Sequence, residues 1–176
     1  MARRPAVLLA VAALAALAYA WTARGGDGAP VSGPPGAAGD VLRGRVVRVT
    51  DGDTIRVALG NRSERVRYIG IDTPEDVKPD TPVQCFARAA AAANGRLVGG
   101  REVRLVLDAE PRDRYGRLLA YVFRGDDGLF VNAELVRDGF ARTLTIPPNV
   151  RYARRFAGLV TQARRAGRGL WRACPP

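Results

Sequence analysis

Histidine is absent from this sequence of 176 residues, and its absence excludes several classes of catalytic site. A Ser-His-Asp triad, a histidine-dependent nuclease and most catalytic zinc centres all need an imidazole. Any hydrolytic reaction must therefore use carboxylates, tyrosine, arginine or a metal-bound water. Cysteine is scarce as well. Cys85 and Cys174 are the only two and have no CxxC spacing, which argues against a structural zinc site.

Lysine is represented by Lys78 alone, so arginine carries almost all of the positive charge. The sequence has 28 basic against 17 acidic residues, a formal net charge of +11. A surplus of this size favours a polyanionic partner, either nucleic acid or an anionic membrane surface. The alternative is a basic surface that only keeps the protein soluble. The length allows one domain with a core of its own.

The N-terminal part has the composition of a targeting segment followed by a linker. Residues 1–23 combine Arg3 and Arg4 with an apolar run over 6–20 that ends in a small-x-small site. This pattern predicts either a cleaved signal peptide or a retained membrane anchor through residues 6–23. Both alternatives place the rest of the chain outside the cytoplasm, secreted or anchored. Residues 24–40, rich in Gly, Pro and Ala, are predicted to be a flexible linker.

Export bears on the two cysteines, because a disulfide persists outside the cytoplasm. We therefore favour a bond between Cys85 and Cys174, which would tie down the last helix; two free thiols are the alternative.

Residues 41–176 are predicted to form the folded domain. The residue patterns favour five short strands, at 41–49, 54–59, 64–71, 101–107 and 118–123. A helix is expected between the third and fourth strands, starting from a capping box at 81–84 and ending near residue 99. Two further helices are expected at the end, at 133–138 and from Asn149 to about 165. The prediction is an α+β, predominantly β fold: a five-stranded OB-type barrel with an inserted helix and two C-terminal helices.

The second and third of these strands organise the candidate site. They are joined by turn-forming Gly60-Asn61, so pairing would bring their other ends together. Those ends carry Asp53 and Asp72, with Glu75 just beyond. Carboxylates gathered at one point repel each other unless a cation lies among them, which makes a metal site the first hypothesis.

Four stretches in this order resemble the staphylococcal-nuclease-like (thermonuclease) family over roughly residues 41–171. They are Asp-Gly-Asp-Thr at 51–54, Val-Arg-Tyr-Ile-Gly-Ile-Asp-Thr-Pro-Glu at 66–75, Asp-Arg-Tyr-Gly-Arg-Leu-Leu-Ala-Tyr at 113–121 and Val-Asn-Ala-Glu-Leu-Val-Arg-Asp-Gly at 131–139. The resemblance implies an OB-fold phosphodiesterase that depends on calcium and acts on DNA and RNA.

The same resemblance assigns roles to particular residues. Asp53 and Asp72 would be carboxylate ligands of Ca²⁺, and Thr73 would add its backbone carbonyl. Hard oxygen ligands suit Ca²⁺, or less well Mg²⁺, rather than zinc. Glu75 would position or deprotonate the attacking water.

Arginines complete the expected site. Arg67 and Arg117 would contact the phosphate as catalytic residues, and Arg114 with Tyr115 would bind a terminal phosphate. Considered alone, each of these site residues also has a purely structural explanation, either as a solvent-exposed charge on a strand or as a residue that shapes a turn. Asp51 and Asp113 are expected to shape their turns rather than to bind metal.

One feature departs from the family. Its members often carry tyrosines before the last helix, where this sequence has Thr-Ile-Pro-Pro-Asn at 145–149. Tyr115 and Tyr152 remain as aromatic candidates for contact with a base. The expected protein is an exported, monomeric endonuclease with broad sequence specificity and a preference for single strands. The alternative is a non-catalytic nucleic-acid-binding OB module.

Overall fold

The protein is described from a computed structural model, which describes residues 39–75 and 82–174. The predicted targeting segment and residues 24–38 of the predicted linker lie outside these ranges. None of the helices within them is long and apolar enough to cross a membrane.

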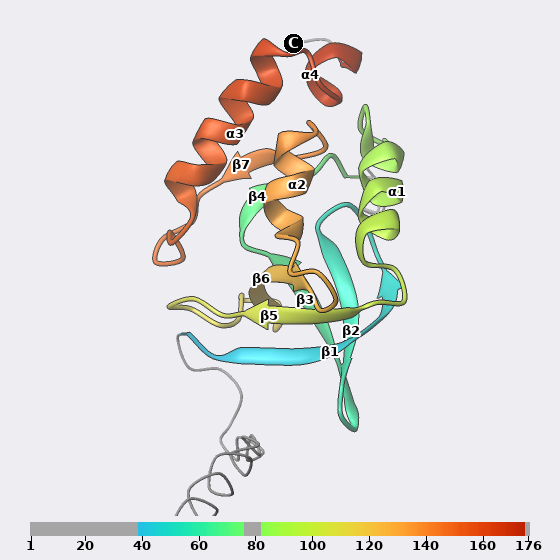
Figure 1. Ribbon diagram of the computed structural model, residues 1–176, viewed down its shortest axis with the longest axis vertical. Helices are drawn as coiled ribbons and strands as arrows, with labels where there is room; N and C mark the ends of the chain where they lie inside the picture. The colour runs from blue at the N-terminus through green and yellow to red at the C-terminus, as the bar shows by residue number, and fades with distance from the viewer. Residues whose placement is uncertain (1–38, 76–81, 175–176) are drawn as a thin grey trace, which may run out of the picture. The chain divides into compact units, whose positions relative to one another are not determined.

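Five strands close into a barrel (Figure 1). These strands are β1 (Val41–Val49), β2 (Thr54–Leu59), β3 (Arg62–Tyr68), β5 (Glu102–Val106) and β6 (Leu118–Arg124). Their order around the barrel is β1-β2-β3-β6-β5, and β5 returns to pair with β1. All neighbours are antiparallel except β3 and β6, which are parallel. The predicted five-stranded barrel is therefore confirmed.

The β2–β3 hairpin has the predicted turn. Its loop is the pair Gly60-Asn61, and Gly60 has the positive φ of 59° that a tight two-residue turn favours. Side chains alternate along the strands, so that Ile55, Val57 and Val66 point into the core and are fully buried. This alternation leaves the intervening polar residues on the outer face.

The predicted third strand, 64–71, is in fact two strands. It breaks after Tyr68, and β4 (Gly70–Asp72) leaves the barrel to pair with β7 (Arg142–Leu144) in a separate two-stranded sheet. Gly70 makes this change of direction possible, because its φ is 81° and a Cβ there would lie 2.5 Å from the ring of Phe156. The strand β7 was not expected from the sequence.

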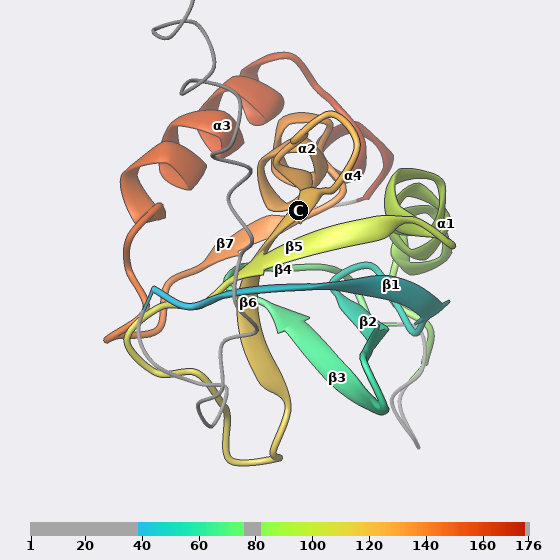
Figure 2. The same cartoon turned by 60° about the horizontal axis from the view of Figure 1, so that its bottom comes forward.

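Four helices lie on one side of the barrel in both views (Figures 1 and 2). They are α1 (Ala87–Val98), α2 (Val131–Arg137), α3 (Ala153–Arg165) and the short α4 (Leu170–Ala173). The inserted helix and two C-terminal helices are as predicted, but α4 is additional and α1 starts later than the predicted capping box. A disulfide joins Cys85, just before α1, to Cys174, just after α4, which confirms the predicted bond.

Candidate active site

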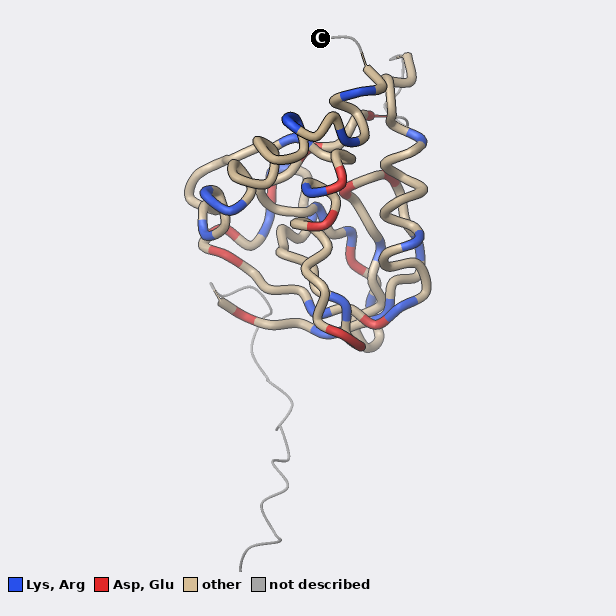
Figure 3. Tube along the Cα trace, turned by 45° about the horizontal axis from the view of Figure 1, so that its top comes forward, with Lys and Arg blue, Asp and Glu red and all other residues tan. Residues whose placement is uncertain are grey.

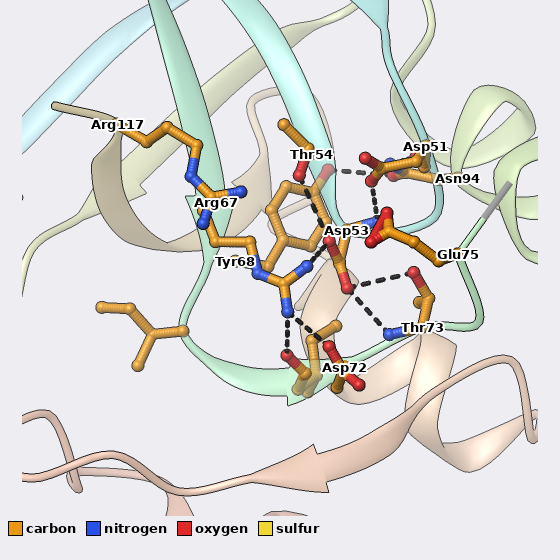
Figure 4. A network of polar contacts seen from close by, with 12 residues as sticks. Asp51, Asp53, Thr54, Arg67, Tyr68, Asp72, Thr73, Glu75, Asn94 and Arg117 are labelled. Atoms are coloured by element: carbon orange, nitrogen blue, oxygen red, sulfur yellow. Dashed lines mark hydrogen bonds and ion pairs between the residues drawn. The ribbon is translucent and has the colours of Figure 1, made fainter. Parts of the chain in front are cut away.

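Asp53 lies at the centre of the site, immediately before β2, and its side chain is only 1% exposed (Figure 4). Its Oδ2 accepts hydrogen bonds from the backbone N–H of Thr73 (2.8 Å) and from the Thr73 hydroxyl (3.0 Å). Its Oδ1 accepts from the Thr54 hydroxyl (3.2 Å) and from Nη1 of Arg67. A carboxylate this deeply buried needs such partners, because an unpaired one would cost a large desolvation free energy.

Arg67 connects the barrel to the strand that leaves it. Strand pairing sets Arg67 of β3 opposite Thr54 at the start of β2, so its side chain reaches Asp53. Its Nη2 donates to Oδ1 of Asp72 (2.7 Å) and to the carbonyl of Ile71 (3.3 Å). One guanidinium is thus shared between two carboxylates. The Asp72 side chain is 52% exposed, whereas that of Asp53 is buried.

Asp51 shapes the turn before β2, as predicted. Its Oδ1 accepts a hydrogen bond from the backbone N–H of Asp53 (2.9 Å). Burial raises the pKa of its carboxyl above the ordinary value, against a smaller opposing effect of Arg67. Its carbonyl accepts from the side chain of Asn94 (2.9 Å), which in turn accepts from the hydroxyl of Tyr68 (2.9 Å). One signal in the sequence could have indicated this support: Asn94 is a single polar residue next to an alanine run.

Glu75 is held through its backbone by Gln84. The Glu75 N–H donates to Oε1 of Gln84, and the Gln84 N–H donates to the Glu75 carbonyl, both at 2.9 Å. The predicted capping box is therefore wrong, because Gln84 supports Glu75 rather than the start of α1. In Figure 4 the Glu75 side chain lies on the side of Asp53 opposite Arg67. The disulfide at Cys85 fixes the residue next to Gln84.

Arg117 is positioned by a loop rather than by the barrel interior. Asp113 accepts hydrogen bonds from the backbone N–H groups of Tyr115 (3.0 Å) and Arg117 (2.9 Å) through Oδ1, and from Nε of Arg117 (2.7 Å) through Oδ2. Partial burial alone would raise the pKa of Asp113, but these bonds to Arg117 lower it below its usual value. The expectation that Asp113 orients its loop is confirmed.

Tyr115 lies at the tip of this loop with 60% of its surface exposed. Nη2 of Arg114 donates to its hydroxyl (2.6 Å), and the guanidinium carbons of Arg114 and Arg117 lie 4.8 and 5.5 Å from the centre of its ring. Tyr152 is different, because its ring packs edge-on against Tyr121 at 4.6 Å inside an aromatic cluster. Of the two aromatic candidates, Tyr115 is therefore the more exposed, whereas Tyr152 is half-buried within the aromatic cluster.

A pocket of about 460 Å³ brings the two arginines together. Arg67 and Arg117 both line it, and so does Tyr115. Part of the wall is formed by Leu144 and Ile146, which are 40% and 59% exposed. The segment without tyrosines therefore still borders the pocket, but with aliphatic rather than aromatic side chains. This wall was not predicted from the sequence.

The carboxylates do not gather as closely as the hairpin pattern predicts. In residues 39–75 and 82–174, no three Asp, Glu or Cys residues are close enough together to hold a metal ion. Two carboxylates, those of Asp53 and Asp72, instead meet at the guanidinium of Arg67. Two hard oxygen donors directed at one positive group suit Ca²⁺ or Mg²⁺, with coordination left over for water and phosphate. The residues present therefore fit a divalent cation.

Comparison with known proteins assigns the family. The profile described as "Staphylococcal nuclease homologue" matches residues 65–173. The chain belongs to the staphylococcal nuclease family. The thermonuclease of Staphylococcus intermedius is 43% identical over 126 residues, which cover 72% of this chain and 74% of that protein. The thermonuclease of Staphylococcus hyicus is 40% identical over 127 residues, with the same coverage.

A third relative extends the similarity beyond the proteins named thermonuclease. Endonuclease YncB of Bacillus subtilis (strain 168) is 40% identical over 111 residues, which cover 62% of this chain and 52% of that protein. The profile match includes the candidate residues from Arg67 to Arg117, whereas Asp53 precedes it. Membership of the family confirms the resemblance inferred from the four motifs.

Proposed function

We propose that this nuclease is an exported, calcium-dependent endonuclease that hydrolyses phosphodiester bonds of DNA and RNA with broad sequence specificity. Relatives named thermonuclease and endonuclease support hydrolysis of nucleic acid as the activity. One structural observation carries the proposal: Arg67 and Arg117 line the same pocket beside the Asp53–Asp72 pair. The two guanidinium groups would bind the phosphodiester, and the two carboxylates beside them would bind a divalent cation.

Asp53 and Asp72, with the backbone carbonyl of Thr73, are the residues that would hold Ca²⁺. When bound, the ion supplies Lewis-acid stabilisation of the charge on the phosphoryl oxygens. Asp53 is suited to this task because hydrogen bonds from Thr73 fix its carboxylate before any ion arrives. A ligand set held in place beforehand loses little conformational entropy on binding.

Arg67 and Arg117 would grip the phosphate from two sides of the pocket. A guanidinium offers a planar pair of donors that matches two phosphate oxygens, and it stays charged at all relevant pH values. Donors fixed in advance stabilise the charge that develops in the transition state, which is the largest effect in many such sites. Asp113 fixes Arg117 in this way through its Nε, which leaves the two terminal nitrogens for the phosphate.

Glu75 would hold the attacking water in line with the leaving oxygen. A carboxylate with an ordinary pKa of about 4.3 is a weak base at neutral pH, so orientation of the water is the larger part of this role. The two backbone hydrogen bonds with Gln84 fix the position of Glu75 on the chain.

The pocket favours a single strand over a duplex. The ring of Tyr115 and the side chains of Leu144 and Ile146 border one space, into which an unstacked base would fit. A base inside a duplex cannot enter such a space without leaving the stack. Arg114 beside Tyr115 would bind a terminal phosphate of a short product.

Export is supported by the N-terminal sequence and by the disulfide. The apolar run over 6–20 follows Arg3 and Arg4, as in a signal peptide or an N-terminal anchor. A bond between Cys85 and Cys174 is typical of proteins that leave the reducing cytoplasm. We propose that the enzyme acts there as a monomer.

A cleavage assay tests this proposal against the alternative of a non-catalytic binding module. Single-stranded DNA and RNA are incubated with the purified protein in Ca²⁺, in Mg²⁺ and in EDTA, and the products are sized on a gel. We expect internal cleavage of both polymers in Ca²⁺ and none in EDTA. Binding of the same strands without cleavage in any metal would contradict the proposal and support the binding module.

A further inference from the structure

A row of three arginines crosses the outer surface of the barrel, and none of the three lines the pocket. In the strand registers, Arg48 of β1 lies opposite Arg56 of β2, and Arg56 lies opposite Arg65 of β3. All three side chains are exposed. Neighbouring strands are about 4.8 Å apart, so the row is about 10 Å long at the backbone.

No carboxylate among the described residues neutralises the charges of this row. Among the described residues, Arg48 and Arg56 have no ion-pair or hydrogen-bond partner for their side chains. Arg43 of β1 likewise has none within these residues, but it lies outside the row, whereas Arg45 of β1 pairs with Glu102 and Arg101, just before β5, pairs with Asp126. Like charges directly opposite each other on a sheet are destabilising, so a polyanion at this surface would relieve a repulsion that the folded protein otherwise bears.

A β-bulge creates the row. The β1–β2 register shifts between Val46 and Arg48, so that Val47 is the extra residue. The shift sets Arg48, rather than the apolar Val47, directly opposite Arg56. Blue segments occur on the barrel strands as well as on the C-terminal helices in Figure 3, but only some of these cations are aligned across neighbouring strands.

The row is continuous with the candidate active site. Arg65 and Arg67 are two residues apart on β3 and therefore lie on the same face of the strand. Nη2 of Arg65 also donates to the backbone carbonyl of Tyr115 (3.4 Å), in the loop that holds Arg117. Glu64, which precedes Arg65, lies on the other face, where Arg112 binds both of its carboxylate oxygens.

We propose that Arg48, Arg56 and Arg65 form a track that binds the phosphates of a nucleic-acid strand on its way into or out of the pocket. This inference rests on the proposed function, because it assigns the row to the same substrate. The pocket then acts on the bond to be cleaved, and the track adds affinity only for substrates long enough to reach it. Phosphate binding of this kind carries no sequence preference, in agreement with broad specificity.

The test uses the double variant Arg48→Gln/Arg56→Gln in the full-length protein. Arg65 is left unchanged because it donates to the loop of Tyr115. Initial rates are measured with a single-stranded 30-mer and with a dinucleotide, each at several salt concentrations. We expect kcat/KM for the 30-mer to fall about tenfold at low salt, because KM rises while kcat stays the same. The slope of log(kcat/KM) against log[salt] should become shallower by about two, because each substituted arginine would otherwise neutralise one phosphate. The value for the dinucleotide should not change.

The matched control is Arg96→Gln/Arg165→Gln, which removes the same charge from α1 and α3. Both of these residues are exposed, and neither lines the pocket or belongs to the row. The control should cleave the 30-mer like the parent protein. Equal losses in the two double variants would overturn the track in favour of a general charge effect, and so would equal losses on the 30-mer and the dinucleotide.

A binding measurement separates failure of the track from failure of the enzyme proposal. Fluorescence anisotropy of a labelled 30-mer in EDTA reports affinity without turnover. Weaker binding by the row variant alone would support the track even if no cleavage were observed. The membrane is tested with phosphatidylserine vesicles. If the row variant lost vesicle binding and kept its affinity for the 30-mer, the track would be wrong and the row would be a membrane-binding surface.

Discussion

The two arginines that line the pocket are held in different ways. Arg67 lies on a barrel strand, is 15% exposed and bridges two carboxylates that belong to the proposed metal site. Arg117 lies at the end of a surface loop, is 27% exposed and pairs with Asp113, only four residues away. One arginine is therefore tied to the core and to the metal ligands, while the other depends on a local turn.

Because of this difference, substitution of Arg67 should affect both stability and activity, whereas substitution of Arg117 should affect mainly activity. Removing Arg67 leaves the buried carboxylate of Asp53 without its positive partner, which affects folding as well as catalysis. Removing Arg117 leaves Asp113 with its backbone hydrogen bonds and partial access to water. The two sides of the pocket should therefore respond differently to the same substitution.

The two pocket arginines are compared through the variants Arg67→Gln and Arg117→Gln, which should have the largest effects on activity. Each should lower kcat/KM about 1000-fold, since each removes a fixed donor to the developing charge. Only Arg67→Gln should also lower the free energy of unfolding strongly, by about 3 kcal/mol, against less than about 1 kcal/mol for Arg117→Gln. Urea denaturation and initial rates measure both quantities. Equal loss of stability in the two variants would show that the two sides are not held differently.

Removal of the disulfide should have the next largest effect. This bond lies on the side of the site that carries Glu75. Cys85→Ser/Cys174→Ser removes a crosslink between residues 89 positions apart. The unfolded chain then regains conformational freedom, and the free energy of unfolding should fall by about 4 kcal/mol. The parent protein in reducing agent should show the same loss of stability. If neither differed from the oxidised protein, the bond would not stabilise the fold.

The variant Asp113→Asn weakens only the contacts that hold the loop of Arg117. Because Arg117 is then less well positioned, kcat/KM should fall about tenfold. Because the pKa of Asp113 is lowered in the folded protein, its stabilising effect is complete above the ordinary Asp value, 3.8, and is lost as the pH falls through the lowered pKa. The Arg117 loop should thus stay ordered at neutral pH and loosen only in acid. Tyr115 fluorescence between pH 2 and 6 follows this change. An unchanged acid transition in the Asn variant would rule out Asp113 as its source.

Gln84→Ala is expected to have the smallest effect, a loss of about 1 kcal/mol in stability and a fall in kcat with little change in KM. The reason is that the Glu75 N–H loses its acceptor. Gln84→Glu keeps an acceptor at that position and is the control. Equal falls in kcat for Ala and Glu would mean that the hydrogen bond does not position Glu75.

Much of the fold and part of the site could be predicted from the sequence. The Gly60-Asn61 turn fixes the register of a hairpin, and that register alone brings Arg67 toward Asp53. The pairing of β4 with β7 could not be predicted, because three-residue strands carry almost no pattern and β7 is exposed at every position. The role of Gln84 was missed because it depends on a hydrogen bond between residues nine positions apart.

The position of Arg67 between the carboxylates was also not predictable. Strand patterns place a side chain on a face, but they do not say which partner it reaches. The hairpin pattern required a cation where Asp53 and Asp72 meet, and in this structure the cation is a guanidinium. Arg67 and a divalent ion would therefore compete for the same carboxylate oxygens.

Calorimetric titration with Ca²⁺ tests the assignment of Asp53 and Asp72 most directly, because it reads the metal site without turnover. The parent protein, Arg67→Gln and Asp72→Asn are titrated under identical conditions. We expect Ca²⁺ to bind more tightly to Arg67→Gln, which removes the competing guanidinium, and more weakly to Asp72→Asn. An unchanged affinity in both variants would contradict the assignment and place the ion, if it binds, elsewhere.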